Sequence, residues 1–137
     1  GTLTTAPSTV KFLQGALREV VVSGTGAGVF AGFPIEVSGK TGTGQVFGRN
    51  PNGTLKDDTS WFASYAPSKK PRFAVVMMVG QGGFGASTSG VGVRQIYEAI
   101  FGVKGNKVVP GAAIYPNGKP PTDLPKISPA TKPKEAP

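Results

Sequence analysis

The chain has 137 residues, a formal net charge of +8, and neither cysteine nor histidine. Its length fits one domain. Without cysteine it has no disulfide and no thiolate metal site, and without histidine it lacks the usual general base and the commonest metal ligand. No signal peptide is visible, and no apolar run approaches the roughly 20 residues of a membrane-spanning helix. Because the chain begins abruptly at Gly1, we expect it to be a segment of a longer protein.

The composition changes at residue 104. Prolines and lysines dominate residues 104–137, and such a segment cannot bury enough apolar surface to offset its chain entropy. We therefore expect one folded portion, residues 1–103, followed by a disordered tail over 104–137. Each part carries +4 (nine basic less five acidic residues before Lys104, six less two from it onward), so the charge does not form one dense basic face.

The first predicted element is a helix with Ser8 or Thr9 as its N-cap. Apolar residues recur at helical spacing as far as Val21, and Gly24 and Gly26 then end the helix.

Three antiparallel strands are predicted next, over about residues 34–44, 58–66 and 72–80. The first begins with alternating apolar and polar residues, and the second is rich in aromatic residues. The third contains the wholly apolar run Phe73–Val79, which predicts a strand in the middle of the sheet with both faces covered. A basic turn, Pro67–Pro71, separates the last two strands.

The third strand leads into a glycine-rich loop, Gly80–Gly85, which we predict to be flexible. A final amphipathic helix follows over about residues 91–102, with Gly102 as its C-cap. The apolar face of this helix consists of Val93, Ile96, Tyr97, Ile100 and Phe101. The order of elements predicts an α+β fold, in which a three-stranded antiparallel sheet carries the C-terminal helix on one face.

The stretch Val37–Gly48, VSGKTGTGQVFG, places Lys40, Thr41 and Thr43 among four glycines. Its Gly-Lys-Thr matches the end of a phosphate-binding loop, but Pro34 stands where that pattern needs its first glycine. A helix must also follow the lysine, and glycines follow instead. The sequence therefore disfavours a phosphate loop and leaves two alternatives, a plain strand end or a binding strand.

Lys-Thr-Gly on a strand, followed by an aromatic strand, an apolar strand and a closing helix, is typical of one enzyme group. Lys-Thr-Gly is the third motif of the serine β-lactamases and penicillin-binding proteins, beside S-x-x-K and S-D-N. Residues 8–103 resemble the C-terminal end of a class B penicillin-binding transpeptidase domain, most of all the actinobacterial elongation type. The similarity rests on VVVSGTGAGVF (20–30), VSGKTGT (37–43), TSWFASYAP (59–67) and VGVRQIYEAIFG (91–102).

The resemblance implies a peptidoglycan D,D-transpeptidase, in which a serine attacks an acyl-D-Ala-D-Ala stem peptide or a β-lactam. A lysine one helical turn from that serine acts as the base, so neither histidine, metal nor cofactor is needed. Lys40 would place a positive charge near the substrate carboxylate, and the hydroxyls of Thr41 and Thr43 would donate to it. Gly42 would let the substrate approach the strand, and the Thr43 N–H would be an oxyanion donor.

The chain lacks the rest of this active site. Ser8-Thr9-Val10-Lys11 has the S-x-x-K form, but Lys11 lies only 29 positions before Lys40 (40 − 11), where the family places most of a helical subdomain. Ser8 as an N-cap and Lys11 as an exposed side chain explain both residues more simply. No S-x-N occurs, and Tyr115–Asn117, of the form Y-x-N, follows Lys-Thr-Gly and is typical of a turn.

We therefore expect the substrate-binding strand of a transpeptidase without its nucleophile, inactive alone. Its partners would be the remainder of the domain, stem peptides and β-lactams, with no nucleic acid. The parent would lie on the extracytoplasmic face of the membrane, held by an N-terminal anchor that this chain lacks. The alternative is a non-enzymatic module that binds the cell wall or another polyanion through the basic tail.

Overall fold

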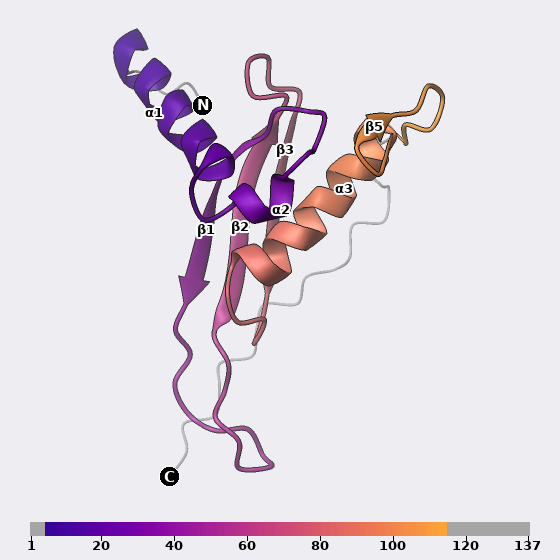
Figure 1. Cartoon of the computed structure of the whole chain (residues 1–137). Helices are drawn as coiled ribbons and strands as arrows, with labels where there is room; N and C mark the ends of the chain where they lie inside the picture. The colour runs from indigo at the N-terminus through magenta and orange to yellow at the C-terminus, as the bar shows by residue number, and fades with distance from the viewer. Residues whose placement is uncertain (1–4, 115–137) are drawn as a thin grey trace, which may run out of the picture.

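A computed structural model describes residues 5–114 (Figure 1). Its core is an antiparallel three-stranded sheet in the order β1-β2-β3. The elements along the chain are α1 (Pro7–Val22), α2 (Ala27–Phe30), β1 (Ser38–Gly44), β2 (Thr59–Ala66), β3 (Phe73–Val79), η1 (Ala86–Gly90), α3 (Val91–Phe101), β4 (Val103–Lys104) and β5 (Lys107–Val108). The predicted α+β fold is confirmed.

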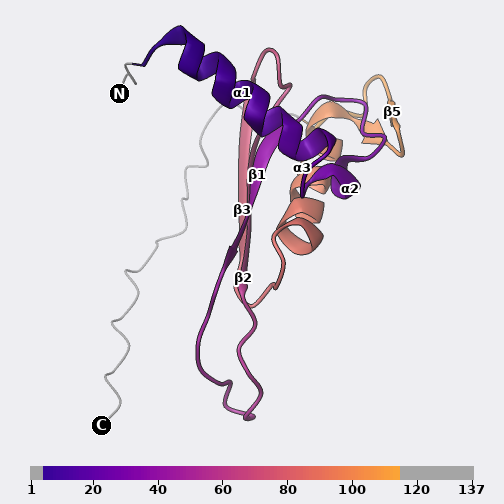
Figure 2. The same cartoon turned by 60° about the vertical axis from the view of Figure 1, so that its left-hand side comes forward.

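The helices cover one face of the sheet. Figure 2 shows the sheet nearly edge-on, with α2 and α3 on the same side, and α1 packs against β1. Phe62 of β2 is fully buried at the centre of this layer, and its ring centroid lies 5.7 Å from that of Phe30 in α2. Val93 and Tyr97 of α3 are also fully buried, as the helical periodicity predicted. The apolar side of α3 therefore closes the core.

The opposite face of the sheet is open in the described part of the chain, and this corrects the prediction for β3. We expected β3 mid-sheet with both faces covered, but β3 is an edge strand and its residues alternate in burial. Val76 and Met78 are 63% and 55% exposed. An apolar run indicates that both faces of a strand are buried in the complete protein. It does not indicate which segment of the protein packs on each face.

The start of α1 also differs from the prediction. Ala6 is the N-cap residue, without a side-chain hydrogen bond, and Pro7 occupies the first turn. Proline suits this position because the first amides of a helix have no intrahelical acceptor. Ser8 is therefore inside the helix rather than at its cap, whereas Lys11 is exposed as expected.

The folded part continues beyond the predicted boundary at residue 103. Gly102 ends α3 in a left-handed conformation (φ 65°), as predicted, and β4 and β5 then form a short hairpin. The hairpin segment returns to the helix end, where Val109 N–H donates to Gly102 O and Ile114 N–H to Ala99 O, both at 2.8 Å. Backbone hydrogen bonds to carbonyl groups at the end of α3 hold residues 104–114, an effect that composition does not reveal. The rest of the expected tail, 115–137, lies outside the described residues.

Among residues 5–114, no helix combines the length and the apolar character needed to cross a membrane.

Candidate functional site

The Lys-Thr-Gly strand, β1, is an edge strand. It pairs only with β2, with Lys40 opposite Ala63, Gly42 opposite Trp61 and Thr43 opposite Ser60. No described strand occupies its outer side. The backbone of β1 is therefore available to an extended ligand, as in other cases where a peptide adds a strand to a sheet.

The side chains of β1 divide between the two faces of the sheet, since successive residues of a strand point in opposite directions. Thr41 and Thr43 lie on the face covered by helices, whereas Lys40 and Gly42 lie on the open face beside Trp61 and Ala63. Lys40 is exposed, and its Nζ donates to Thr41 O at 2.8 Å. No acidic side chain within residues 5–114 forms an ion pair with it. The ammonium group can therefore turn toward an anion at the strand edge.

The two threonines differ in accessibility. Thr41 is only 8% exposed, and its Oγ1 lies 2.8 Å from Oγ1 of Thr25, in the connection between α1 and α2. Thr43 is exposed, and its Oγ1 accepts a hydrogen bond from the Gly85 amide at 3.3 Å. Thr43 therefore offers a hydroxyl to solvent, and Thr41 ties the strand to the helical layer. Gly42 is half-buried, and a side chain there would first contact Trp61 Cβ, at 3.2 Å.

Sequence reasoning missed Thr25 and Gly85. Each lies in a stretch that the sequence singled out, the first within VVVSGTGAGVF and the second at the end of the glycine-rich loop. Neither contact follows from spacing, because the partners are 16 and 42 positions apart.

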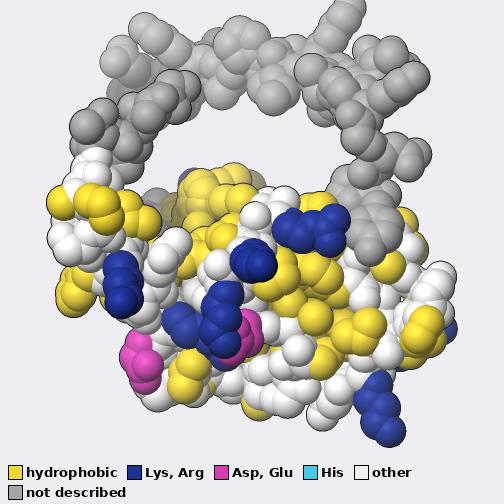
Figure 3. Space-filling view, turned by 90° about the horizontal axis from the view of Figure 1, so that it is seen from above, with side chains coloured by type: hydrophobic (Ala, Val, Ile, Leu, Met, Phe, Trp, Pro, Cys, Tyr) yellow, Lys and Arg dark blue, Asp and Glu magenta, His cyan; other side chains and the backbone are white. Residues whose placement is uncertain are grey.

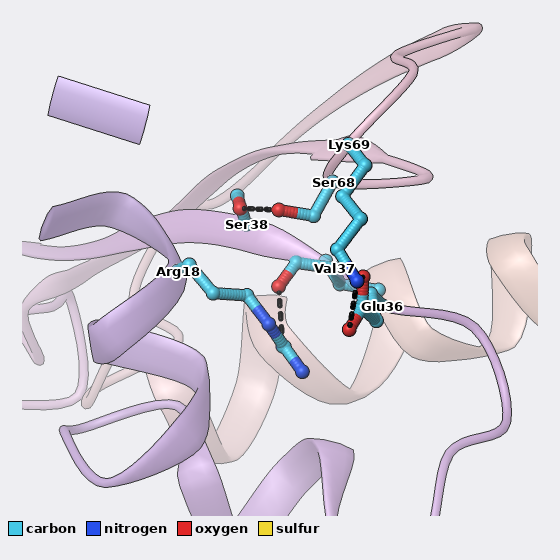
Figure 4. A network of polar contacts seen from close by, with 6 residues as sticks. All are labelled: Arg18, Glu36, Val37, Ser38, Ser68 and Lys69. Carbon is cyan, nitrogen blue, oxygen red and sulfur yellow. Dashed lines mark hydrogen bonds and ion pairs between the residues drawn. The ribbon is translucent and has the colours of Figure 1, made fainter. Parts of the chain in front are cut away.

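At its other end, β1 begins in a polar network (Figure 4). Arg18 of α1 donates to Val37 O at 2.8 Å, and the hydroxyls of Ser38 and Ser68 lie 2.6 Å apart. Lys69 Nζ lies 3.4 Å from the Glu36 carboxylate, an exposed pair of a kind that contributes little to stability. These contacts join α1 and the basic turn to the start of β1.

A hollow of about 310 Å³ lies beside this network, lined by Lys11, Gln14, Gly15, Arg18, Glu36, Ser68 and Lys69. Viewed from above, this end of the molecule carries several Lys and Arg side chains and few acidic ones (Figure 3). Lys70 and Arg72, both exposed, lie in the connection between β2 and β3 that contains this turn. The basic turn predicted from the sequence is thus part of a wider basic surface.

The described residues do not bring a nucleophile to the Lys-Thr-Gly strand. Ser8 and Lys11 are both exposed on α1, whose first turns extend away from the sheet (Figure 1). They offer no alternative to the expected upstream serine. The described chain also contains no group of histidine, cysteine, aspartate or glutamate residues that could hold a metal ion. What β1 offers is a lysine, an exposed hydroxyl and a free strand edge, which suit a peptide with a carboxylate.

The chain is similar in sequence to known proteins. Residues 1–101 match the family model described as the penicillin binding protein transpeptidase domain. The peptidoglycan D,D-transpeptidase MrdA of Haemophilus influenzae is 33% identical over 84 residues, which are 56% of this chain and 13% of that protein. MrdA of Escherichia coli K12 is 33% identical over 87 residues, 58% of this chain and 14% of the relative. The chain thus spans only a small part of the curated relatives it matches.

A solved structure shares the fold over most of the described residues. The crystal structure of Pseudomonas aeruginosa PBP2 in complex with WCK 5153 is similar with a TM-score of 0.66 and 25% identity, covering 82% of this chain and 24% of that one. The chain belongs to the penicillin-binding protein transpeptidase family, and within it is similar to class B proteins of the PBP2/MrdA kind.

Proposed function

We propose that this chain is the C-terminal part of a peptidoglycan D,D-transpeptidase domain of the actinobacterial elongation type, with Lys40, Thr41, Gly42 and Thr43 as its substrate-binding strand. The observation that carries the proposal is the edge position of β1, which leaves the outer edge of its backbone accessible, with Lys40 and Thr43 exposed on either side of that edge. The substrates would be stem peptides that end in acyl-D-Ala-D-Ala, and β-lactams would be the inhibitors. No cofactor is required.

Each residue of the strand has a role in this proposal. Lys40 supplies the charge that attracts the substrate carboxylate, and the Thr43 hydroxyl donates to it. Charge-assisted hydrogen bonds of this kind contribute roughly 1.5–3 kcal/mol each. Gly42 keeps the strand edge clear, and the Thr43 N–H serves as an oxyanion donor. Thr41 acts mainly by holding the strand, since its hydroxyl already lies within hydrogen-bond distance of Thr25.

The remainder of the domain is the proposed partner of the open sheet face. That face presents Trp61, Val76 and Met78, which are 41%, 63% and 55% exposed. A sheet with two apolar faces is stable when both are covered. The upstream part of the same protein would cover this face and supply the serine nucleophile and its lysine. The parent would be anchored by an N-terminal helix, on the extracytoplasmic face of the bacterial membrane.

Fluorescent penicillin tests the proposal in the full-length parent. We expect one covalently labelled protein, and labelling should be blocked by unlabelled penicillin. The 137-residue chain alone should form no adduct by intact mass, because it lacks the nucleophile and base. A parent that is never labelled would overturn the function, and a stable adduct on Ser8 would make this chain a self-contained enzyme.

The basic surface supports one alternative, a non-enzymatic module that binds an anionic wall polymer. Lys11, Arg18 and Lys69 line the hollow near the start of β1, with Glu36 as the acidic residue among the lining side chains. The basic tail that the sequence suggested for this role lies outside the described residues from residue 115 onward. Polyanion binding that weakens steeply with salt, in a parent that penicillin does not label, would favour this alternative.

A further inference from the structure

We infer that the glycine-rich loop is a positioning element for the substrate-binding strand, with Gly85 orienting the hydroxyl of Thr43. The inference rests on the proposed function and extends it to a second segment, because Gly85 lies 42 positions after Thr43. Gly85 would not contact the reacting atoms, so it is a positioning residue rather than a catalytic one.

A hydrogen bond joins the loop to the side chain of Thr43. The Gly85 amide donates to Thr43 Oγ1 at 3.3 Å. A hydroxyl carries one proton and two acceptor lone pairs. Because the oxygen already accepts from the loop, its proton remains available for an acceptor outside the protein. The bond therefore favours the orientation in which Thr43 donates to a substrate carboxylate.

The loop also approaches the strand closely at Gly85. A Cβ atom on Gly85 would lie 2.5 Å from Gly42 O and 2.6 Å from Trp61 O, distances that side chains do not tolerate. The backbone of Gly85 has φ −57° and ψ −40°, which any residue adopts. Glycine is therefore required here because a side chain would clash with neighbouring backbone atoms, and not because of an unusual backbone conformation. The loop packs directly against the Lys-Thr-Gly strand and against β2.

A buried pair of serines fixes the position of the loop. Ser60, opposite Thr43 on β2, and Ser89 of η1 are both fully buried. Their hydroxyl oxygens lie 2.8 Å apart, and the Ser89 amide donates to Ser60 Oγ at 3.1 Å. Ser60 Oγ also lies 3.2 Å from Phe84 O. Ser60 of β2 thus contacts the chain on both sides of Gly85, at Phe84 and at Ser89. We predicted a flexible loop from its glycines, and these contacts give it a defined place.

The test is acylation of the full-length parent by a penicillin and by the methyl ester of the same penicillin. The ester lacks the carboxylate that Thr43 would bind. Its acylation rate therefore depends on the rest of the active site but not on that contact. Gly85→Ala should slow acylation by the free acid about 10-fold more than acylation by the ester, since a misplacement of about 1 Å can cost as much as 10²-fold. Gly28→Ala is the matched control, because Gly28 lies in α2, outside the loop, and a Cβ there meets nothing within 4 Å. It should leave both rates unchanged.

A second variant covers the case in which Gly85→Ala does not fold. Ser89→Ala removes the buried hydroxyl without adding volume, and it should lower the free-acid rate about 3-fold or more relative to the ester. Thr43→Val combined with Ser89→Ala should then lose little beyond Thr43→Val alone, since both act on one contact. The inference would be overturned if the acylation rates of acid and ester fell equally, or if the effects of Thr43→Val and Ser89→Ala were strictly additive. A wild-type parent that neither compound acylates would instead refute the proposed function.

Discussion

Thr25 and Thr41 share a hydrogen bond between their hydroxyls, which lie 2.8 Å apart across the boundary between the helical layer and the Lys-Thr-Gly strand. The bond joins the connection after α1 to the middle of β1. The bond gives a hydrogen-bonding partner to the hydroxyl of a largely buried side chain, because Thr41 is only 8% exposed. The strand that we propose binds substrate is therefore held in place from the side opposite to Lys40.

This pairing predicts an asymmetry between single and double variants. Thr25→Val should destabilise the 137-residue chain by about 1–3 kcal/mol, because it leaves the Thr41 hydroxyl buried without its partner. Thr25→Val with Thr41→Val should restore part of the loss, since both polar groups are then gone. Thermal unfolding measures the effect, and Thr9→Val at an exposed site is the control. A double variant less stable than either single one would contradict this interpretation.

The core predicts a larger effect at Phe62. Its side chain is fully buried between the sheet and the helices, so Phe62→Ala should cost about 3–5 kcal/mol. Phe12 provides a matched control on α1, because it is 73% exposed. Chemical denaturation of the two alanine variants should give clearly different midpoints. Similar midpoints would mean that Phe62 is not the centre of the core.

Tyr97 predicts a loss of stability at alkaline pH. Burial raises the pKa of its phenol above the ordinary value of 10.0, although hydrogen bonds to Ser64 and to Val75 O act in the opposite direction. A raised pKa in the folded state means that unfolded chains lose this proton first. The stabilising contribution is complete below pH 10 and declines as the pH rises toward the folded-state pKa. Unfolding free energies between pH 9 and 11 should fall less steeply in Tyr97→Phe than in the wild type, and parallel slopes would refute the prediction.

The backbone hydrogen bonds at the end of α3 indicate where the chain can be truncated without loss of stability. A chain that ends at Val103 loses the bonds from Val109 to Gly102 and from Ile114 to Ala99, whereas one that ends at Ile114 keeps both. Each backbone bond contributes about 0.5–1.5 kcal/mol. The shorter chain should therefore melt about 5 °C or more below the longer one, at the roughly 4–8 °C expected per kcal/mol in a small domain. Equal melting temperatures would restore the boundary at residue 103.

Local features of the sequence predicted the elements of this fold well. The spacing of Val93, Tyr97 and Ile100 identified both the last helix and the side that it buries. The alternation around Ile35 indicated a strand that begins somewhat later, at Ser38, although Val37 is fully buried. Periodicity works here because the side chains that decide burial belong to one element.

The sequence did not predict what depends on contacts between distant segments. The apolar run of β3 placed that strand in the middle of the sheet, whereas within the described residues it is at the edge. The hydrogen bonds of Thr25 and Gly85 to the Lys-Thr-Gly strand join segments 16 and 42 positions apart. Such contacts are set by packing, and neither composition nor spacing determines which hydroxyl meets which amide. The resemblance identified the strand but not its supports.

Lys40 gives the most direct prediction about the proposed function. In the full-length parent, Lys40→Ala should slow acylation by penicillin about 10²-fold or more, the effect expected when a preorganised electrostatic group is lost. Thr41→Val should slow it less, because the lysine charge remains and Thr41 acts mainly through the position of the strand. Lys56→Ala is the charge-matched control, since Lys56 is an exposed lysine in the connection between β1 and β2. It should leave the rate unchanged. Stopped-flow measurement of the acylation rate distinguishes these cases. If Lys40→Ala reacted as fast as the wild type, the Lys-Thr-Gly stretch would be an ordinary strand end, and the proposed substrate-binding role would fail with it.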